Sequence, residues 1–361
     1  MTNYSGNKTE LLPLKKSPLY EQVKKALRVY MSNTSSENLP TENELQRMFN
    51  VSRITIRRAL KELEEEGKLQ SVQGSGRVIV RSRKILKTGY IGIVQGPNPE
   101  QYQQEILQAA DICLKRYRIT TALNIIDPKS DDVMERLMLF ASKVDGLIFC
   151  NFTIKSDDVY AAMKEYLPRC VVLRDPPEKD YPMNSVQEDR VMAFEKIASH
   201  LKELGHENIA FIGSVKPNGP RMEGIRRGLG RDLDPELAIS SPGWRHNAYT
   251  ATEELLSRKK YFSAVICNSD TCALGVMEKL LEKGVRIPED VSVTGYDNII
   301  DSVNYPISLT TAGAERTKLV EKAIDLIFRN SIENPDFPVK TLIEPELKIR
   351  ASTGKIEGRT F

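Results

Sequence analysis

The stretch from Thr41 to Val80 constrains the fold of this 361-residue chain more than any other part, because it encodes four structural elements in a row. Thr41 and Glu44 have the spacing of a capping box, which predicts a helix that begins near residue 42. Between this first helix and Ser52 there is room only for a tight turn, and Ser52 can cap a second helix. Residues 69–72 and 77–80 are typical of two short strands joined by a glycine-rich tip. The sequence therefore predicts helix, turn, helix and hairpin.

The second helix has two chemically different faces. Its apolar residues recur at helical spacing and predict one buried stripe: Ile56, Ala59, Leu60 and Leu63. The first turn carries cations and a hydroxyl group that must face elsewhere: Arg53, Thr55, Arg57 and Arg58. The positive end of the helix dipole also favours an anion there, so a phosphate backbone fits this face. Ile54 points away from the buried stripe, where it either meets a thymine methyl group or has no role.

The hairpin tip has the composition of a segment that approaches a sugar-phosphate surface. Gly74 and Gly76 let the backbone run close to such a surface, while Gln73 and Arg77 can reach a groove edge. An ordinary turn is the alternative for a Gly-Ser-Gly tip. Its place directly after the two helices favours a role in nucleic-acid binding.

These motifs resemble the winged helix-turn-helix domain of GntR-type bacterial transcription regulators over about residues 18–80. The motifs are Pro40-Thr41-Glu42, Val51-Ser52-Arg53, Thr55-Ile56-Arg57, Gly67 and Gln73-Gly74-Ser75-Gly76. The resemblance implies double-stranded operator DNA as a partner, with base-reading places for Glu42, Arg53 and Gln73. It also implies phosphate-contacting places for Ser52, Thr55 and Arg57. Asn43 stands where many relatives carry arginine, so that contact is not expected.

Net positive charge is confined to the first quarter of the chain. Residues 1–88 carry 17 Lys and Arg against 9 Asp and Glu, whereas the remainder carries 35 against 40. A basic head on an acidic body is expected when only the head meets nucleic acid.

The cysteine and histidine patterns argue against disulfides and metal binding. The five cysteines form no CxxC pair and lie mostly beside apolar runs, as reduced core residues of a cytoplasmic protein do. The three histidines lack ligand spacing, so neither a metal nor another cofactor is expected. No apolar run is long enough for secretion or membrane insertion.

Polar segments divide the chain into parts. Residues 1–17 are expected to be disordered, 18–80 to form the winged domain, and the basic segment 81–88 to link it to a body at 89–353. The tail, residues 354–361, contains Ile-Glu-Gly-Arg, a protease recognition sequence, and is left outside the predicted fold.

From Gly89 onward, short apolar runs alternate with amphipathic segments of helix length. The runs are residues 90–94, 121–126, 146–150, 170–173, 208–212, 264–267 and 291–294. This alternation predicts an α/β body of doubly wound parallel sheet, with helices on both faces. The number of runs and a polar break near residues 174–189 favour two lobes. Ligands bind beyond the carboxyl ends of parallel strands, so the loops there should line a cleft.

The body resembles the effector domain of LacI/GalR repressors, which is related to periplasmic sugar-binding proteins, over about residues 89–353. The motifs are Asp189, residues 204–210, Arg221 to Gly228, Ser269-Asp270 with Ala273-Leu274-Gly275, residues 288–297, Leu309-Thr310-Thr311 and residues 350–353. The resemblance implies a pocket formed by Tyr102, Arg174, Arg221, Trp244, Ser269 and Asp297. Asp189 and Asp270 also precede helices, and N-capping explains them at lower cost than ligand contact.

The side chains of this pocket suit a polar ring. Trp244, the only tryptophan, can pack on the flat face of a pyranose or a purine, or else cover the edge of the core. The Arg221 guanidinium can donate to two vicinal hydroxyls, or else form a surface salt bridge. The Asp297 carboxylate, at a strand end, can accept from two sugar hydroxyls. Ser269 and Ala314 stand where relatives can have Asn and Gln, so two contacts are shortened or absent.

The combined expectation is a ligand-responsive transcription regulator. A repressor of carbohydrate-utilisation genes, released from its operator by a neutral sugar, is favoured. Arg174 would also suit an anionic group, so a sugar phosphate or a nucleobase is the alternative effector. A homodimer is expected, because two heads on adjacent half-sites reach a specificity that one head cannot. A sugar-modifying enzyme is disfavoured, since the chain has neither a phosphate-binding GxxxxGK[ST] loop nor a nucleophile elbow.

Overall fold

A computed structural model describes residues 18–34, 36, 38–66, 68–72, 76–79, 88–97, 99–152, 154, 156–173, 182–330 and 337–356. The chain divides between Ile85 and Leu86 into two compact units, a head and a body. Each unit has its own hydrophobic core and is described by itself.

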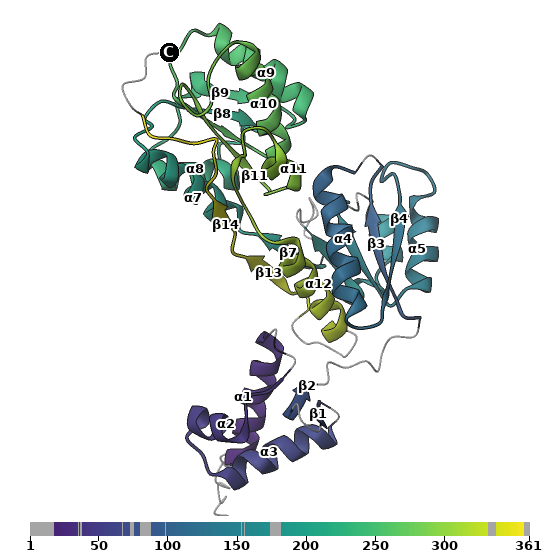
Figure 1. Cartoon of the computed structure of the whole chain (residues 1–361). Helices are drawn as coiled ribbons and strands as arrows, with labels where there is room; N and C mark the ends of the chain where they lie inside the picture. The colour runs from purple at the N-terminus through teal and green to yellow at the C-terminus, as the bar shows by residue number, and fades with distance from the viewer. Residues whose placement is uncertain are drawn as a thin grey trace, which may run out of the picture. The chain divides into compact units, whose positions relative to one another are not determined.

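The head contains the predicted elements in the predicted order, preceded by one further helix (Figure 1). Its elements are α1 (Leu19–Asn33), α2 (Glu42–Phe49), α3 (Arg53–Glu65), β1 (Leu69–Val72) and β2 (Gly76–Ile79). The strands β1 and β2 pair antiparallel, as expected for a wing. Gly67, the tip residues 73–75 and Val80 lie outside the described residues.

Local capping fixes where the two central helices of the head begin. The Thr41 hydroxyl accepts from the Glu44 N–H at 3.4 Å, and the Glu44 carboxylate accepts from the Thr41 N–H at 2.8 Å, which completes the capping box. The Ser52 hydroxyl accepts from the Thr55 N–H at 3.3 Å. The predicted stripe of α3 is buried against α1, α2 and the wing. The sequence-based prediction of the helix-turn-helix is therefore confirmed.

The body consists of two six-stranded sheets, one in each of two lobes (Figure 1). The first sheet has the order β13-β7-β6-β5-β3-β4 and is parallel throughout. Its strands are β3 (Tyr90–Gln95), β4 (Thr120–Ile125), β5 (Gly146–Cys150), β6 (Cys170–Leu173), β7 (Asn184–Glu188) and β13 (Lys340–Ile343). The second sheet has the order β14-β12-β11-β10-β8-β9, and only its edge strand β14 is antiparallel. Its strands are β8 (Ile209–Gly213), β9 (Ala238–Ser240), β10 (Ala264–Cys267), β11 (Ser292–Tyr296), β12 (Thr310–Gly313) and β14 (Glu346–Lys348).

Helices cover these sheets. In the first lobe they are α4 (Gln101–Lys115), α5 (Val133–Lys143), α6 (Asp157–Ala162), the short η1 (Leu167–Arg169) and α12 (Arg316–Asn330). In the second lobe they are α7 (Arg190–Glu203), α8 (Pro220–Leu229), η2 (Pro235–Leu237), α9 (Arg245–Ser257), α10 (Asp270–Glu282) and α11 (Ile300–Asn304). The chain passes between the lobes three times, after β7, after β12 and after β13.

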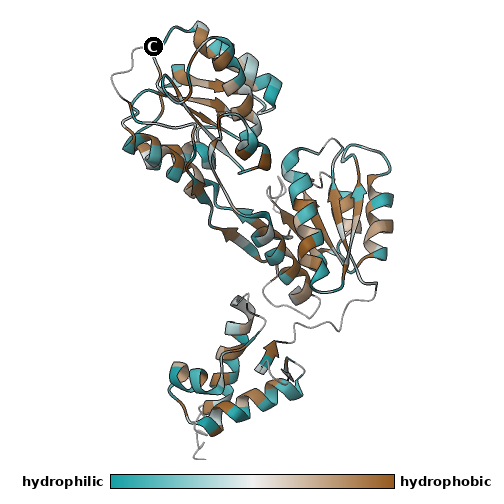
Figure 2. Ribbon diagram, viewed as in Figure 1, coloured by the Kyte–Doolittle hydropathy of each residue, from teal (hydrophilic) through white to brown (hydrophobic). Residues whose placement is uncertain are grey.

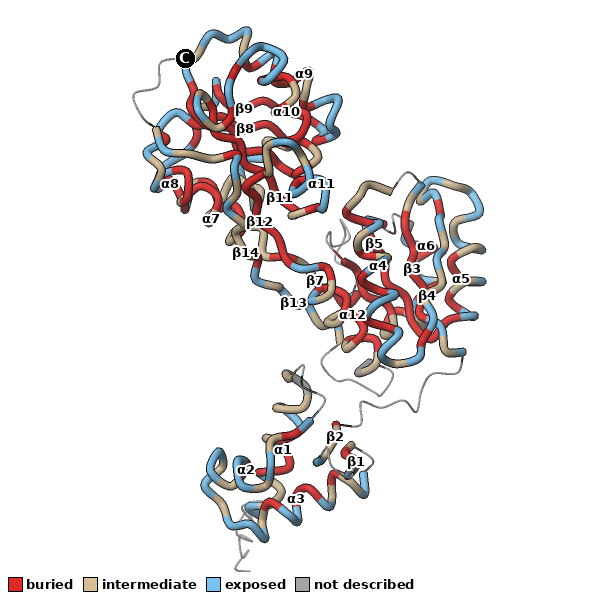
Figure 3. The backbone as a smooth tube through the Cα atoms, in the orientation of Figure 1, coloured by how far each residue is buried: buried red, intermediate tan, exposed pale blue. Residues whose placement is uncertain are grey.

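Each sheet is apolar on both faces. Along β5, Ile148 and Cys150 belong to the core under α4 and α12, whereas Leu147 and Phe149 belong to the core on the opposite face. Central strands such as β3 and β8 are mostly brown in the hydropathy view and red in the burial view, whereas the edge strands β13 and β14 are only partly buried (Figures 2 and 3). All five cysteines are unpaired and buried. Among the described residues, no helix is both long and apolar enough to cross a membrane.

The polar break predicted at residues 174–189 is partly wrong. Residues 182–188 include β7, which lies between β6 and β13 in the first sheet, while residues 174–181 are outside the described residues. The polar side chains of β7 are buried because they find partners. The Asn184 amide donates to the Cys170 carbonyl at 3.2 Å and accepts from the Val339 N–H at 2.9 Å. Satisfied polar groups allow a strand that composition alone does not indicate.

Candidate DNA interface and effector site

The start of α3 presents an exposed face of mixed character. Ile54 is 81% exposed, and Arg53 and Arg57 are exposed beside it. The hydroxyls of Ser52 and Thr55 lie 2.8 Å apart and hydrogen-bond to each other. Both hydroxyls are therefore part of the helix cap while remaining at the surface.

Glu42, the first residue of α2, gathers three arginines from two other elements. Its carboxylate accepts from Arg53 Nε at 3.1 Å, from Arg57 Nε at 3.0 Å and from Arg77 Nη1 at 3.0 Å. Partial burial by itself would raise the pKa of Glu42, but the arginines, led by Arg77, lower it to about 2. A single carboxylate thus contacts three of the four arginines that were predicted to contact DNA.

Arg77 has a further partner besides Glu42, whereas Arg58 has other partners in place of Glu42. Arg77 Nε also donates to Glu64 at 2.8 Å, which ties the wing to α3. Arg58 turns toward α1 instead, where its guanidinium carbon lies 3.8 Å from the centre of the Tyr20 ring. Arg58 is therefore not part of the group around Glu42. Gln73 and Gly74 lie outside the described residues.

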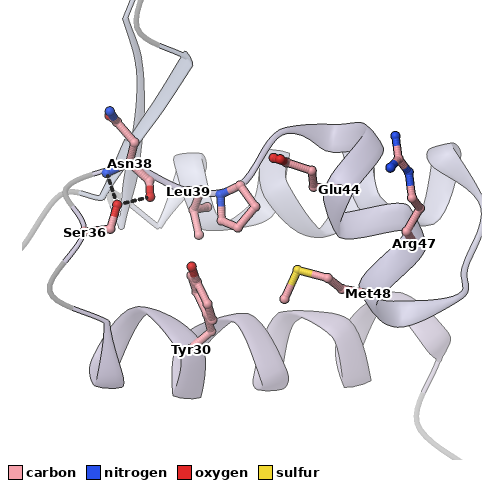
Figure 4. A pocket seen from close by; sticks show the side chains of 8 residues that line it. Tyr30, Ser36, Asn38, Leu39, Glu44, Arg47 and Met48 are labelled. Carbon is pink, nitrogen blue, oxygen red and sulfur yellow. Dashed lines mark hydrogen bonds between the residues drawn. The ribbon is translucent and has the colours of Figure 1, made fainter.

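A groove of about 530 Å³ opens on the head between α1 and α2 (Figure 4). Tyr30 from α1 and Met48 from α2 form apolar parts of its lining, and Glu44 and Arg47 lie along it. No residue of the groove belongs to the predicted DNA-contact set.

In the body, the predicted effector residues follow the carboxyl ends of strands. Arg221 is in the first turn of α8, after β8, and Trp244 directly precedes α9, after β9. Ser269 follows β10, and Asp297 follows β11. Tyr102 lies at the start of α4, after β3 of the other lobe. Arg174 lies outside the described residues. The observed strand order places four of the six at one edge of the second sheet, where ligands bind in parallel sheets.

Arg316, at the start of α12, connects Tyr102 to Asp297. Its guanidinium carbon lies 4.2 Å from the centre of the Tyr102 ring, and the guanidinium donates to the backbone carbonyl of Asp297. It also pairs with Glu105 at 3.3 Å and Glu188 at 3.7 Å. The Tyr102 hydroxyl donates to Glu188 at 3.4 Å. Two predicted effector residues from different lobes are thus joined through one buried cation.

Acidic groups outnumber cations in this cluster. Three carboxylates, those of Glu105, Glu188 and Asp297, surround the single guanidinium of Arg316. Burial by itself would lower the pKa of Arg316, but these anions and Tyr102 raise it. Burial raises the pKa of Glu105. Glu105 also accepts from the Ile300 N–H at 2.7 Å, so α4 of one lobe contacts α11 of the other.

The remaining predicted effector residues lie in two places. Ser269 donates to the Gly243 carbonyl at 3.5 Å, which brings it beside the loop of Trp244. Trp244 is 49% exposed, so it covers the edge of its lobe only in part. The Arg221 guanidinium carbon lies 5.8 Å from the centre of the Phe194 ring.

Asp189 and Asp270 were both expected to cap helices, but only one of them does so in the structure. Asp189 caps α7 as predicted, because its carboxylate accepts from the Met192 N–H at 3.0 Å. The prediction for Asp270 is wrong, since Ser269 caps α10 by accepting from the Cys272 N–H at 3.2 Å. Asp270 is fully buried and accepts from the Ile299 N–H and the Thr311 hydroxyl. Burial raises the pKa of Asp270 to about 7.

Three residues of this cluster, Glu105, Glu188 and Arg316, were not predicted from the sequence. Glu188 directly precedes Asp189, a motif residue, so its position at a lobe crossover was available as a signal. No sequence signal indicated Arg316, because its burial arises only when α4, β7 and the loop after β11 come together in the fold. Among the described residues, no group of three or more His, Cys, Asp or Glu side chains is placed to hold a metal ion.

Two family models match the chain, one in each unit. Residues 19–79 match the gntR family of bacterial regulatory proteins, and residues 198–353 match a periplasmic binding protein-like domain. The chain is 28% identical over 289 residues to the HTH-type transcriptional regulator RegA of Clostridium saccharobutylicum, covering 76% of this chain and 85% of RegA. It is also 28% identical over 300 residues to the HTH-type transcriptional repressor PurR of Mannheimia succiniciproducens, covering 80% of this chain and 88% of PurR.

Solved structures share the fold at lower identity. A complex of the transcriptional regulator CelR with cellobiose has a TM-score of 0.64 at 23% identity, covering 85% of this chain and 94% of CelR. The lac repressor dimer bound to operator and the anti-inducer ONPF has a TM-score of 0.63 at 22% identity, covering 74% of this chain and 95% of that one.

The chain therefore carries two separate matches, one to the gntR family of bacterial regulatory proteins in its head and one to a periplasmic binding protein-like domain in its body. A DNA-binding transcription regulator is the class of protein that the head match and these relatives indicate. Its relatives are transcription regulators, which are not enzymes.

Proposed function

We propose that the protein represses carbohydrate-utilisation genes and leaves its operator when a neutral sugar binds between the lobes of its body. The observation that carries this proposal is the cluster around Arg316. It joins Tyr102 of the first lobe to Asp297 of the second at the carboxyl ends of their strands. A ligand held there contacts both lobes, so its binding energy depends on how far they close.

A neutral, hydroxyl-rich effector fits this cluster better than an anionic one. Among the described residues around Arg316, three carboxylates face its guanidinium, so a phosphate or carboxylate group beside them would meet excess negative charge. Sugar hydroxyls, in contrast, donate to carboxylates and stack by their C–H face on an aromatic ring such as Trp244. The cellobiose in the CelR complex is a sugar of this kind. A sugar phosphate and a nucleobase remain the alternatives for the titration below.

The head is proposed to read operator DNA with the exposed start of α3 and with the wing. Arg53, Arg57 and Arg77 supply cations for phosphates and base edges, and Ile54 supplies an apolar contact. Arg53→Ala should lose about 1–3 kcal/mol of specific DNA affinity while effector binding stays intact. Equal loss of both activities would show that the variant is unfolded.

A homodimer is proposed as the DNA-binding form. One head covers few base pairs, whereas two heads on half-sites about 34 Å apart multiply their specificity. The solved lac repressor is a dimer on its operator. Effector binding would then change the spacing of the two heads and so oppose DNA binding by linkage.

The decisive experiment is a Trp244 fluorescence titration, followed by an operator gel shift. The panel contains D-ribose, L-arabinose, D-xylose, D-glucose, cellobiose, D-ribose 5-phosphate and adenine. A neutral sugar should change the fluorescence and also release the operator. Release by the phosphate or by adenine alone would overturn the neutral-sugar assignment, and chemical conversion of any compound would overturn the regulatory one.

A further inference from the structure

Buried side-chain oxygens without a hydrogen-bond donor occur at strand ends and in the segments that follow them, in both lobes of the body. The amide oxygens of Gln95, Gln101, Gln103 and Asn268 are buried and accept no hydrogen bond from the described part of the chain. Gln95 ends β3, Gln101 and Gln103 begin α4, and Asn268 follows β10. A buried acceptor left without a donor has lost its hydrogen bonds to water without replacement, which is unfavourable. Ligands of parallel sheets bind beyond the carboxyl ends of the strands, and a polar ligand there would supply the donors that these oxygens lack.

Asn268 has the most closely defined surroundings of the four. Its N–H donates to the Ile212 carbonyl at 3.0 Å, which holds the residue at the end of β10 beside β8. Its side chain lies against two glycines from neighbouring strand ends. A Cβ on Gly213 would lie 2.4 Å from Asn268 Cβ, and a Cβ on Gly243 would lie 2.7 Å from Asn268 Nδ2. The two glycines therefore make the space that this amide occupies.

The neighbouring residues leave a polar contact at this strand end to Asn268. The Ser269 hydroxyl is engaged as the cap of α10 and with the Gly243 carbonyl. Asp270 is engaged with Ile299 and Thr311 in the interior. The amide of Asn268, by contrast, retains donors and an acceptor that suit a sugar hydroxyl, which both donates and accepts.

We propose that Asn268 is an effector-contact residue that binds a hydroxyl group of the ligand, a role that rests on the proposed sugar-responsive function. The Asn268 side chain lies against Gly243, and Trp244 is the next residue in the chain. The indole ring and the Asn268 amide therefore act on adjacent parts of the same ligand. Asn268 thereby supplies the amide that Ser269 lacks.

Asn268→Leu tests this role, because leucine has nearly the same shape and no polar atoms. Thr121→Val is the matched control, since Thr121 Oγ1 on β4 is also buried without a partner but lies away from the effector residues. Calorimetric titration uses the sugar panel above, and thermal unfolding is followed without sugar. Asn268→Leu should weaken the binding of the active sugar at least tenfold, while its melting temperature equals or exceeds that of the wild type. Thr121→Val should bind that sugar normally.

The outcomes separate this inference from the proposed function. Wild-type affinity in both Asn268→Leu and the smaller Asn268→Ala would overturn the role of Asn268 and leave the sugar response standing. If the wild type binds no sugar, the proposed sugar response is wrong. The melting temperature of Asn268→Leu then still tests the role of Asn268. A lower melting temperature in Asn268→Leu would mark a structural residue and overturn the inference, whereas a higher one would support an acceptor kept for a ligand.

Discussion

Glu42 controls where the cations of the head lie, because one carboxylate contacts Arg53, Arg57 and Arg77. The sequence resemblance assigned Glu42 to base reading, and its contacts add a positioning role for the arginines. Both roles depend on a negative charge that opposes the phosphate backbone. We therefore expect specific binding to need Glu42 and non-specific binding to be weakened by it.

Glu42→Gln should separate specific from non-specific DNA affinity. The arginines lose their shared anion, so affinity for operator falls, while affinity for unrelated duplex rises because one negative charge is removed. The salt dependence should steepen by about one counterion. Fluorescence anisotropy with both duplexes over a salt series measures this. Glu65→Gln, on an exposed carboxylate of α3, is the control for charge alone. Equal changes in the two variants on both duplexes would contradict the positioning role.

Asp270 makes the stability of the body depend on pH. Its pKa is about 7 in the folded chain because of burial, against an ordinary value of 3.8. The folded state therefore binds the proton more tightly than the unfolded state between these values. Stability from this group is full below about pH 4 and decreases as the pH rises toward 7.

Asp270→Asn should flatten this dependence, since asparagine does not titrate. Urea unfolding at several pH values between 4.5 and 8 gives the free energy of unfolding for both proteins. The wild type should lose stability relative to the variant as the pH rises, even where the variant is less stable throughout. Parallel curves would show that Asp270 titrates normally in the folded chain.

At the scale of elements, one face of α3 packs in the core and stabilises the head, while the opposite face is exposed and is proposed to contact DNA. Leu60 is almost fully buried in the core of the head, whereas Ile54 is exposed on the face with Arg53 and Arg57. Leu60→Ala should destabilise the head by about 2–5 kcal/mol. Ile54→Ala should change stability by less than about 0.5 kcal/mol.

The two variants also differ in DNA binding. At a temperature where both heads are folded, Ile54→Ala should weaken operator binding and Leu60→Ala should not. Circular dichroism during denaturation and a gel shift provide the two readouts. Unchanged operator affinity in Ile54→Ala would assign Ile54 no role, the alternative that its sequence context leaves open.

Strand β7 could not be predicted from the local sequence pattern. Asn184, Ser185 and Glu188 make the segment polar, yet all three are buried in the first sheet or at its edge. Asn184 bonds to β6 and to the residue before β13, and Glu188 accepts from the Ala314 N–H. These partners are 14, 155 and 126 positions away in the chain, so local periodicity carries no trace of them.

At the scale of the molecule, the body has two lobes linked by three crossovers, and Arg316 stands at one of them. It binds Glu105 of one lobe and the Asp297 carbonyl of the other. Any ligand that engages Tyr102 and Asp297 therefore acts on the lobe junction directly. Linkage requires that an effector that weakens operator binding is itself bound less tightly by the operator complex.

Asp297→Asn should break this linkage while leaving the fold intact. Asparagine tolerates the positive φ of this position, 114°, and keeps the backbone carbonyl that Arg316 uses. It loses the carboxylate that accepts from sugar hydroxyls. The variant should bind operator normally but no longer release it with the sugar that releases the wild type, as followed by gel shift. Normal release would remove Asp297 from the effector site.

Most elements of this chain, and their order, could be predicted from local sequence. Capping at Thr41 and Ser52, the apolar stripe of α3 and most strands of the body are encoded by neighbouring residues, whose spacing can be read directly. Which polar groups meet, in contrast, could be seen only in the folded chain. The three arginines around Glu42, the burial of Asp270 and the cluster of Arg316 with Glu105 and Glu188 join residues far apart in the chain. Their electrostatics depend on distance and burial, and both arise only after the chain has folded.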